Sequence, residues 1–252
     1  MKDYVQDIRL RRSLTVTAAR ELGLNVVSES AADPQMNFTQ LLDGITGLEH
    51  SMGHHPFYGD VVTFWGKTGA GMTPTLLVGY NVAMGEGWYH QQSKLWEDPK
   101  LTRFITPEQL MRVRSPTKLW PEDMTVWAMG AELRKLYRNG TSLQLGAHGQ
   151  MFGIDAHWEL DLFKRSGFTP QEILEIATIR GATQHGLDAQ LGSLEVGKLA
   201  DLVVLDANPL DDIGNASKIR YVMKNGLLFS GADASRVWPD PRPLGKPYFV
   251  GR

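Results

Sequence analysis

Three titratable side chains stand at or just after short apolar runs that have the length and composition of buried strands. Glu29 ends one such run, His50 ends a second, and His148 lies directly after a third. A carboxylate can bind a hard divalent ion, and an imidazole can act as a metal ligand or as a general base. Structural roles compete with these: a salt bridge for Glu29, and a hydrogen bond to the backbone for His50.

The elements that must position these residues alternate between helices and short apolar strands. Strands are expected at residues 24–29, 47–50, 72–78 and 142–147. Helices are expected at residues 5–22, 59–67, 122–137 and 158–165, and over 169–183, where Thr169 and Glu172 form a capping box. Such alternation predicts βα units around a parallel sheet.

Residues 80–120 break this rhythm. The stretch is rich in Trp, Tyr and Gly and contains Pro99, Pro107 and Pro116, so a long loop is expected. Trp88 and Tyr89 are candidates for lining a substrate-binding cleft. Packing within the loop is the alternative for both aromatic residues.

Composition excludes several classes of protein. Of the 252 residues, 42% are hydrophobic and 21% charged, and the net charge of −2 gives no basic surface for nucleic acid or an anionic membrane. The absence of cysteine excludes disulfides, thiolate nucleophiles and cysteine-based zinc sites. No apolar run approaches the roughly 18 residues of a membrane span. We also find no phosphate-binding motif with a Walker lysine and no GxGxxG between a strand and a helix.

The character of the sequence changes after residue 187. A turn-rich segment precedes a strand at 200–205, and residues 221–229 predict a hairpin around Asn225-Gly226. The last residues, 238–252, hold four prolines and predict an extended tail. Two domains are therefore expected, residues 1–186 and residues 187–252.

Two C-terminal patterns resemble hallmarks of the amidohydrolase superfamily. They are Gly192-Ser-Leu-Glu-Val-Gly-Lys-Leu-Ala-Asp-Leu-Val-Val-Leu-Asp206 and, before it, Thr169-Pro-Gln-Glu with Ala177-Thr178 and Gly181-Ala182. The resemblance implies an α/β fold, in which a (β/α)₈ TIM barrel is followed by a return to a small β-sandwich. Residues 1–186 would then form a partial barrel of about strands 4/5 to 8, and residues 187–252 the C-terminal part of the sandwich with its tail.

A narrower resemblance concerns one branch of the superfamily. Gly146-Ala-His-Gly-Gln, His157-Trp-Glu-Leu and Tyr221-Val-Met-Lys-Asn-Gly resemble the branch of imidazolonepropionases and prolidase-type peptidases. Members of that branch are often fused behind a Tol-type β-propeller and exported. A periplasmic or secreted location follows if this branch is right, and a cytoplasmic one otherwise.

The family's His-X-His pair on the first barrel strand is not found in this sequence. The seven histidines are His50, His54, His55, His90, His148, His157 and His185, and no two lie two apart. We therefore expect the chain to be a C-terminal fragment of a longer parent.

The resemblance implies metal-assisted hydrolysis, in which a divalent ion such as Zn²⁺ activates water in the full-length parent. His50 matches the sixth-strand histidine ligand. Glu29 stands where most members have a histidine ligand, and His148 where most have a catalytic aspartate. Lys2 resembles a fourth-strand lysine that is carboxylated and bridges two metals in some branches.

Alternatives remain open at several of these positions. Lys2 could be a disordered terminal lysine. Asp155 and His157 are alternatives to His148 as proton-transfer groups. His54 and His55 are interpreted as polar loop residues.

Two functional hypotheses follow. The first is a fragment of a hydrolase that cleaves amide, peptide or cyclic-amide C–N bonds in a small-molecule or peptide substrate. As half of the ligands are missing, the isolated chain should bind metal weakly and be inactive. The second is a non-catalytic or assembly-dependent half-barrel that completes its barrel as a homo-oligomer or with a separate N-terminal chain. Neither hypothesis involves nucleic acid or a membrane.

Overall fold

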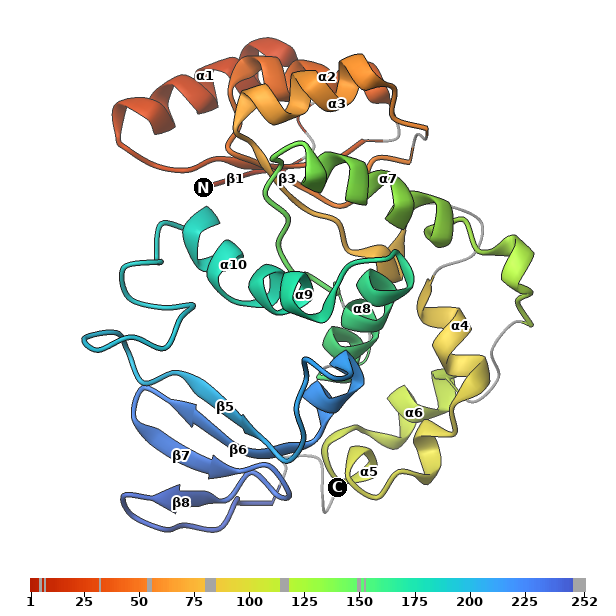
Figure 1. Ribbon diagram of the computed structural model, residues 1–252, viewed down its shortest axis with the longest axis vertical. Coiled ribbons are helices and arrows are strands. Elements are labelled where there is room, and N and C mark those ends of the chain that lie inside the picture. The colour runs from red at the N-terminus through yellow and green to blue at the C-terminus, as the bar shows by residue number, and fades with distance from the viewer. Residues whose placement is uncertain are drawn as a thin grey trace.

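The computed structural model describes residues 1–4, 6, 8–31, 33–53, 56–79, 85–113, 118–148, 151 and 153–246. Two separate sheets lie in this part of the chain, a parallel one near the N-terminus and an antiparallel one near the C-terminus (Figure 1). None of the described helices is long and apolar enough to cross a bilayer.

The parallel sheet has the order β1-β2-β3-β4. Its strands are β1 (Lys2–Asp3), β2 (Val27–Glu29), β3 (Gly47–Glu49) and β4 (Gly71–Thr73). Leu143 extends the sheet by one more position, because it forms a parallel bridge with Met72. The order in space therefore follows the order in sequence, as consecutive βα units require. The predicted parallel sheet of an α/β fold is confirmed.

Helices connect these strands. They are α1 (Arg9–Glu21), α2 (Pro34–Asp43), α3 (Gly59–Thr68) and α7 (Val126–Arg138), and α1, α2 and α3 lie together on one side of the sheet (Figure 1). Local sequence sets their ends. Asp33 accepts a hydrogen bond from the backbone of Gln35 at the start of α2, and Gly44 and Gly69 end α2 and α3 in the left-handed conformation.

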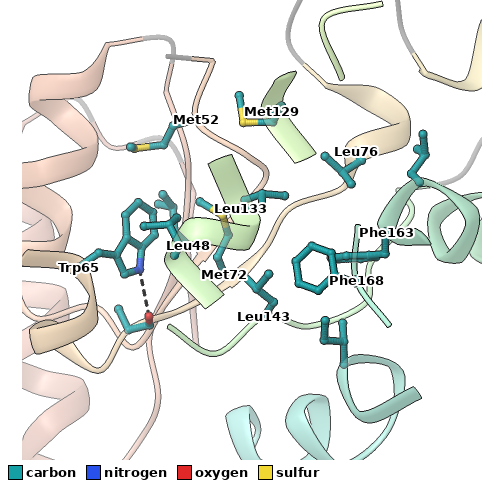
Figure 2. Packing of buried hydrophobic residues seen from close by; sticks show 14 of the residues in the cluster. Leu48, Met52, Trp65, Met72, Leu76, Met129, Leu133, Leu143, Phe163 and Phe168 are labelled. Atoms are coloured by element: carbon teal, nitrogen blue, oxygen red, sulfur yellow. Dashed lines mark hydrogen bonds between the residues drawn. The ribbon is translucent and has the colours of Figure 1, made fainter. Parts of the chain in front are cut away.

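Large apolar side chains from the strands and helices form one main core (Figure 2). Trp65 of α3, Leu48 of β3, Met72 of β4 and Phe163 of α8 (Ile154–Arg165) are fully buried in it. The indole nitrogen of Trp65 donates to the carbonyl of Ala70 at 3.1 Å, so its one polar atom is satisfied. The core thus fixes the strand ends relative to α8.

The stretch that was predicted to be a long loop is largely helical where it is described. It contains α4 (Gly85–Gln92), α5 (Leu101–Phe104), α6 (Pro107–Val113) and the 3₁₀ helix η2 (Leu95–Glu97). A small second core of Leu95, Ile105, Leu110 and Met151 explains the difference. Short helices that are unstable alone become stable when their apolar side chains pack together.

Two other predicted elements are divided in the structure. The strand expected at 72–78 stops at Thr73, and Leu76–Val78 form the 3₁₀ helix η1 instead. The helix expected at 169–183 forms α9 (Pro170–Ala177) and α10 (Ile179–Gln184), separated at Thr178. The predicted capping box between Thr169 and Glu172 is present.

The antiparallel sheet consists of β5 (Leu202–Leu205), β6 (Ile219–Lys224), β7 (Leu227–Ser230) and β8 (Arg236–Trp238), in that order. The predicted hairpin is present, and Asn225 and Gly226 both have positive φ at its turn. No residue of these four strands is buried. The 3₁₀ helix η4 (Ile213–Ser217) ties the sheet to the main core, because its Ile213 is buried there. A second sheet that would make a sandwich stays a prediction, as does the domain boundary near residue 186.

Candidate active site

Four of the residues singled out in the sequence lie in a row at the carboxyl ends of the parallel strands. Lys2 of β1 forms an ion pair with Glu29 at the end of β2. Oε2 of Glu29 lies 2.7 Å from Nε2 of His50, which follows β3. The ring of His148 meets that of His50 edge-on, with 5.0 Å between the centroids. Residues from four separate βα units therefore converge on one place.

The backbone at this edge of the sheet is unusual. His50, Thr75 and His148 have φ values of 70°, 46° and 55°, in the left-handed region that residues other than glycine rarely adopt. Such backbone costs about 1–3 kcal/mol per residue and is found preferentially at functional sites. His50 follows β3, Thr75 follows β4, and His148 follows the Leu143 bridge. In each case the turn comes within five residues of the strand or bridge.

The hydrogen bonds of His50 define its tautomer. A carboxylate only accepts, so the hydrogen between His50 and Glu29 belongs to Nε2 of His50. Nδ1 of a neutral ring is then an acceptor, and the hydroxyl of Thr75 donates to it at 2.6 Å. Burial lowers the pKa of His50 below its usual value and outweighs the opposing charge of Glu29. A neutral, firmly oriented imidazole results.

A second carboxylate and a cation complete the surroundings. Glu49 lies beside Glu29 in the sheet and accepts a hydrogen bond from Thr73 at 3.2 Å. Burial raises the pKa of Glu49. The ammonium of Lys2 is half exposed, and its hydrogen bond to Glu29 raises the pKa of Lys2. Lys2 thus neutralises part of the negative charge of Glu29 and Glu49.

Sequence reasoning missed two residues of this site. Glu49 lies inside the strand expected at 47–50 and not at its end, so no local signal distinguishes it. Thr75 was hidden inside the strand expected at 72–78. The dipeptide Pro74-Thr75 was the available signal, since a proline disfavours a continuing central strand.

These donors suit a divalent ion only in part. One imidazole and one carboxylate are appropriate ligands, and they already lie together in a largely dry environment. However, the described residues contain no group of three or more His, Asp or Glu arranged to hold a metal ion. Both oxygens of Glu29 and both nitrogens of His50 have protein partners. The described residues alone therefore do not form a complete metal site.

The alternatives to His148 lie at the start of α8. Asp155 is buried and accepts a hydrogen bond from the backbone of Met151 at 2.8 Å. His157 is partly buried, and burial lowers its pKa. The positive charge of Lys100 lowers the pKa of His157 further. His54 and His55 lie outside the described residues.

The two aromatic residues proposed for substrate binding differ in their surroundings. The ring of Tyr89 stacks on Trp158 at 5.0 Å, and its hydroxyl donates to Asp161 at 2.6 Å. Trp88 packs edge-on against Trp127 and borders an open groove of about 540 Å³ next to residues 118–121. Tyr89 is thus engaged in packing, while Trp88 faces a groove. A role in substrate binding stays a prediction for both.

Comparison with known proteins identifies relatives for the C-terminal half of the sequence. The profile of the Amidohydrolase family matches residues 136–228. A 5-methylthioadenosine/S-adenosylhomocysteine deaminase of Syntrophobacter fumaroxidans is 30% identical over 132 residues, which cover 43% of this chain and 30% of the relative. An imidazolonepropionase of Symbiobacterium thermophilum is 56% identical over 39 residues, 16% of this chain and 9% of the relative.

Solved structures match nearly the whole chain. A Xaa-Pro dipeptidase with methionine bound in its active site gives a TM-score of 0.63 at 21% identity, covering 89% of this chain and 49% of the other. A protein described as a prolidase from Bifidobacterium longum gives 0.62 at 26% identity, covering 96% of this chain and 53% of the other. The match thus spans about half the length of these structures.

The sequence and structural relatives agree with the parallel sheet and with the order of its βα units. The fold of the described residues is a partial TIM-barrel-like α/β fold. The C-terminal sequence patterns and the family profile point to the same family. Residues 136–228 match the amidohydrolase family, and the chain as a whole is similar in fold to about half the length of these solved structures.

Proposed function

We propose that this chain carries part of the active site of a metal-dependent hydrolase that cleaves carbon–nitrogen bonds. The observation that supports it is the continuous row of Lys2, Glu29, His50 and His148 at the carboxyl ends of parallel strands. In TIM-barrel enzymes, active sites lie at these ends. We assign β1 to β4 and the Leu143 bridge to barrel strands four to eight, and the antiparallel sheet to half of a sandwich.

Each residue then has a distinct role. Glu29 and His50 are the donors that would hold a divalent ion, together with ligands that the described residues do not supply. A bound ion would lower the pKa of a water molecule and polarise the scissile carbonyl. Lys2 limits the negative charge that accumulates beside Glu29. His148 is exposed and can take up or return a proton at a ring nitrogen.

The proposed substrates are amides, peptides or cyclic amides. The relatives include proteins named imidazolonepropionase, ochratoxinase and Xaa-Pro dipeptidase, which supports a place for this chain in the imidazolonepropionase and prolidase-like branch. The groove beside Trp88 is an apolar surface that a substrate side chain could contact.

Zinc binding tests the donor assignment. Because Glu29 and His50 are the only two donors in direct contact among the described residues of the site, we expect Zn²⁺ to bind weakly and to be lost when the protein is desalted before elemental analysis. In equilibrium dialysis against Zn²⁺, Glu29→Gln and His50→Ala should abolish the residual binding. The control His157→Ala changes another histidine, on α8, and should retain it.

Three results would contradict this assignment. One tightly held ion per chain after desalting would show that the described residues do form a complete site. Unchanged zinc binding in both Glu29→Gln and His50→Ala would show that the donors lie elsewhere. Loss of zinc binding in His157→Ala alone would show that His157, and not Glu29 or His50, is the zinc ligand.

A second candidate function is a half-barrel that works only in an assembly. Leu10 and Leu14 lie one turn apart on α1 and are 68% and 61% exposed, and Leu22 is exposed just beyond the helix. β1 is an edge strand, because among the described strands it pairs only with β2. An apolar helix face beside an open sheet edge favours association with another chain.

Light scattering tests this second candidate. We expect a dimer or larger species that dissociates when Leu10 and Leu14 are both replaced by Gln. Leu42→Gln, at a comparably exposed leucine on α2, is the control and should leave the assembly intact. A stable monomer of the unmodified chain at high concentration would contradict this candidate.

A further inference from the structure

Glu159 is an acidic residue inside the main apolar core. Its side chain lies on α8 and is 0% exposed, and no ion pair is found for it among the described residues. Its two oxygens instead accept hydrogen bonds from the backbone N–H groups of Leu76 and Leu77, at 2.8 and 3.0 Å. These are the first two residues of η1 (Leu76–Val78). The carboxyl group therefore binds the chain just after β4.

Thr75 immediately precedes the two residues that Glu159 holds. It is buried, and its φ of 46° is in the left-handed region, which a β-branched side chain rarely adopts. Fixing the next two N–H groups leaves the chain little freedom to relax this turn. The conformation of Thr75 in turn directs its hydroxyl to Nδ1 of His50 at 2.6 Å.

The ends of β3 and β4 are also joined through their backbones. The N–H of His50 donates to the carbonyl of Thr73, and that of Ser51 donates to the carbonyl of Pro74, both at 2.8 Å. A displacement of residues 74–77 would therefore move the backbone around His50 as well as the hydroxyl that orients its ring.

We propose that Glu159 is a positioning residue that orients His50 through Leu76, Leu77 and Thr75. The inference rests on the proposed function for the importance of His50, but the orientation itself is a separate property. Glu159 acts from α8 through the backbone N–H groups of Leu76 and Leu77 and need not contact a substrate. The carboxyl group of Glu159 fixes the backbone conformation of residues 75–77. The fold bears the free-energy cost of burying that group.

Comparison with a second buried glutamate, Glu132, shows that Glu159 differs in its partners. Glu132 on α7 also accepts a backbone hydrogen bond, from Phe57 at 2.8 Å, but it is paired with Lys135. Among the described residues, the hydrogen-bond donors to Glu159 are backbone N–H groups, and burial raises its pKa to about 8. Leucine or methionine would fill the same space without the cost of burying a carboxyl group. Binding the two N–H groups is the property that a carboxyl group adds.

The test is the nitrogen NMR spectrum of the His50 imidazole, which reports its tautomer and hydrogen bonds. In the unmodified protein we expect one tautomer, with hydrogen on Nε2. At a pH above 8, where the carboxyl group of Glu159 is ionised, Glu159→Gln opposes an amide NH₂ to one of the two N–H donors. The Nδ1 signal of His50 should then shift toward that of a ring nitrogen without a hydrogen bond, while the hydrogen stays on Nε2 beside Glu29. Thr75→Ala removes the hydroxyl directly and should give the same change. The control Glu132→Gln should leave the spectrum as it was.

Glu159→Asp is included in case the glutamine variant does not fold. It keeps a carboxyl group but is one methylene shorter, so it should displace the His50 signals in the same direction. Combining Thr75→Ala with the Glu159 variant should add nothing further to the His50 spectrum. A purely structural role of Glu159 would lower stability without shifting the Nδ1 signal of His50.

Unchanged His50 signals in a folded Glu159 variant, with a change in Thr75→Ala, would overturn the proposal. An equal change in Glu132→Gln would also overturn it, because the effect would then be a general response to core substitution. Zinc dialysis is measured separately. Failure of the unmodified protein to bind Zn²⁺ would count against the proposed function, whereas the His50 spectra would still decide the role of Glu159.

Discussion

The Nε2 atom of His50 lies 2.7 Å from Oε2 of Glu29, and the two side chains are only 9% and 7% exposed. They come from neighbouring parallel strands, in which Glu29 is paired with Glu49, the residue before His50. Register alone therefore brings two separate sequence positions into hydrogen-bonding contact. A pair with so little access to water must satisfy its polar atoms internally.

Replacing Glu29 should destabilise the fold by an amount that depends on whether the new side chain can still accept the hydrogen bond from Nε2 of His50. Glu29→Ala leaves the Nε2–H of His50 buried without its acceptor, at an expected cost of about 1–3 kcal/mol. Glu29→Gln can still accept that hydrogen and should cost less. Lys2→Ala removes a half-exposed cation and should cost about 0–1 kcal/mol. Urea unfolding measures all three, and an equal loss in the alanine and glutamine variants would contradict this hydrogen bond.

Stability should depend on pH through Glu159. Its pKa is raised from 4.5 to about 8 by burial, so the folded state holds a proton that the unfolded state has lost in this interval. The free energy of unfolding should therefore fall as pH rises toward 8. The lowered pKa of His50 and His157 acts oppositely, raising stability as pH increases to 6.5. Between pH 6.5 and 8 the effect of Glu159 should dominate.

Urea unfolding at several pH values compares the unmodified protein with Glu159→Gln, whose side chain does not titrate. The glutamine variant should lose the decrease between pH 6.5 and 8. Glu132→Gln is the control and should keep it. The same decrease in all three proteins would assign the titration to another group.

The sequence predicted the row of site residues because strand ends carry clear local signals. Glu29, His50 and His148 each follow a short apolar run, and parallel strands bring such ends together. The hairpin at Asn225-Gly226 was equally accessible, since this dipeptide adopts positive φ easily. The strand ends and the hairpin turn could be predicted because each depends on a few adjacent residues.

The parts that could not be predicted depend on distant contacts. Thr75 adopts its conformation because Glu159 holds the two residues that follow it, and Glu159 lies 83 positions beyond Leu76 in the sequence. A loop was expected where α4 to α6 lie, because the stretch is rich in Trp, Tyr and Gly and contains Pro99, Pro107 and Pro116. These helices are stabilised by a shared core that includes Met151. Contacts of this kind leave no local pattern.

The core around α8 should be sensitive to loss of volume. Phe163 is fully buried and packs edge-on against Phe168, with ring centroids 5.2 Å apart. Phe163→Ala should cost about 3–5 kcal/mol, because it removes apolar contacts and leaves a cavity. Leu42→Ala, at an exposed leucine of α2, is the control, with an expected change within about 0.5 kcal/mol. Similar costs for both variants in urea unfolding would contradict the burial of Phe163 in this core.

Gly47 should be required at the start of β3 because Gln184 of α10 packs over it. A Cβ atom at Gly47 would lie 2.8 Å from Nε2 of Gln184 and 3.1 Å from Cγ1 of Val27. Gln184 cannot move away freely, since its Nε2 donates to the carbonyl of Thr46 at 2.6 Å. Gly47→Ala should therefore cost about 1–3 kcal/mol through overpacking.

A double substitution separates crowding by Gln184 from an effect on the strand itself. Gln184→Ala removes the obstructing atoms, so Gly47→Ala should cost much less in that background than in the unmodified chain. Gly59→Ala, at a glycine with open space around its Cβ position, is the control and should be nearly neutral. If Gly47→Ala costs as much in the Gln184→Ala background as in the unmodified chain, α10 does not rest against the strands in this way. The parallel sheet would then need another explanation for a glycine at the start of both β3 and β4.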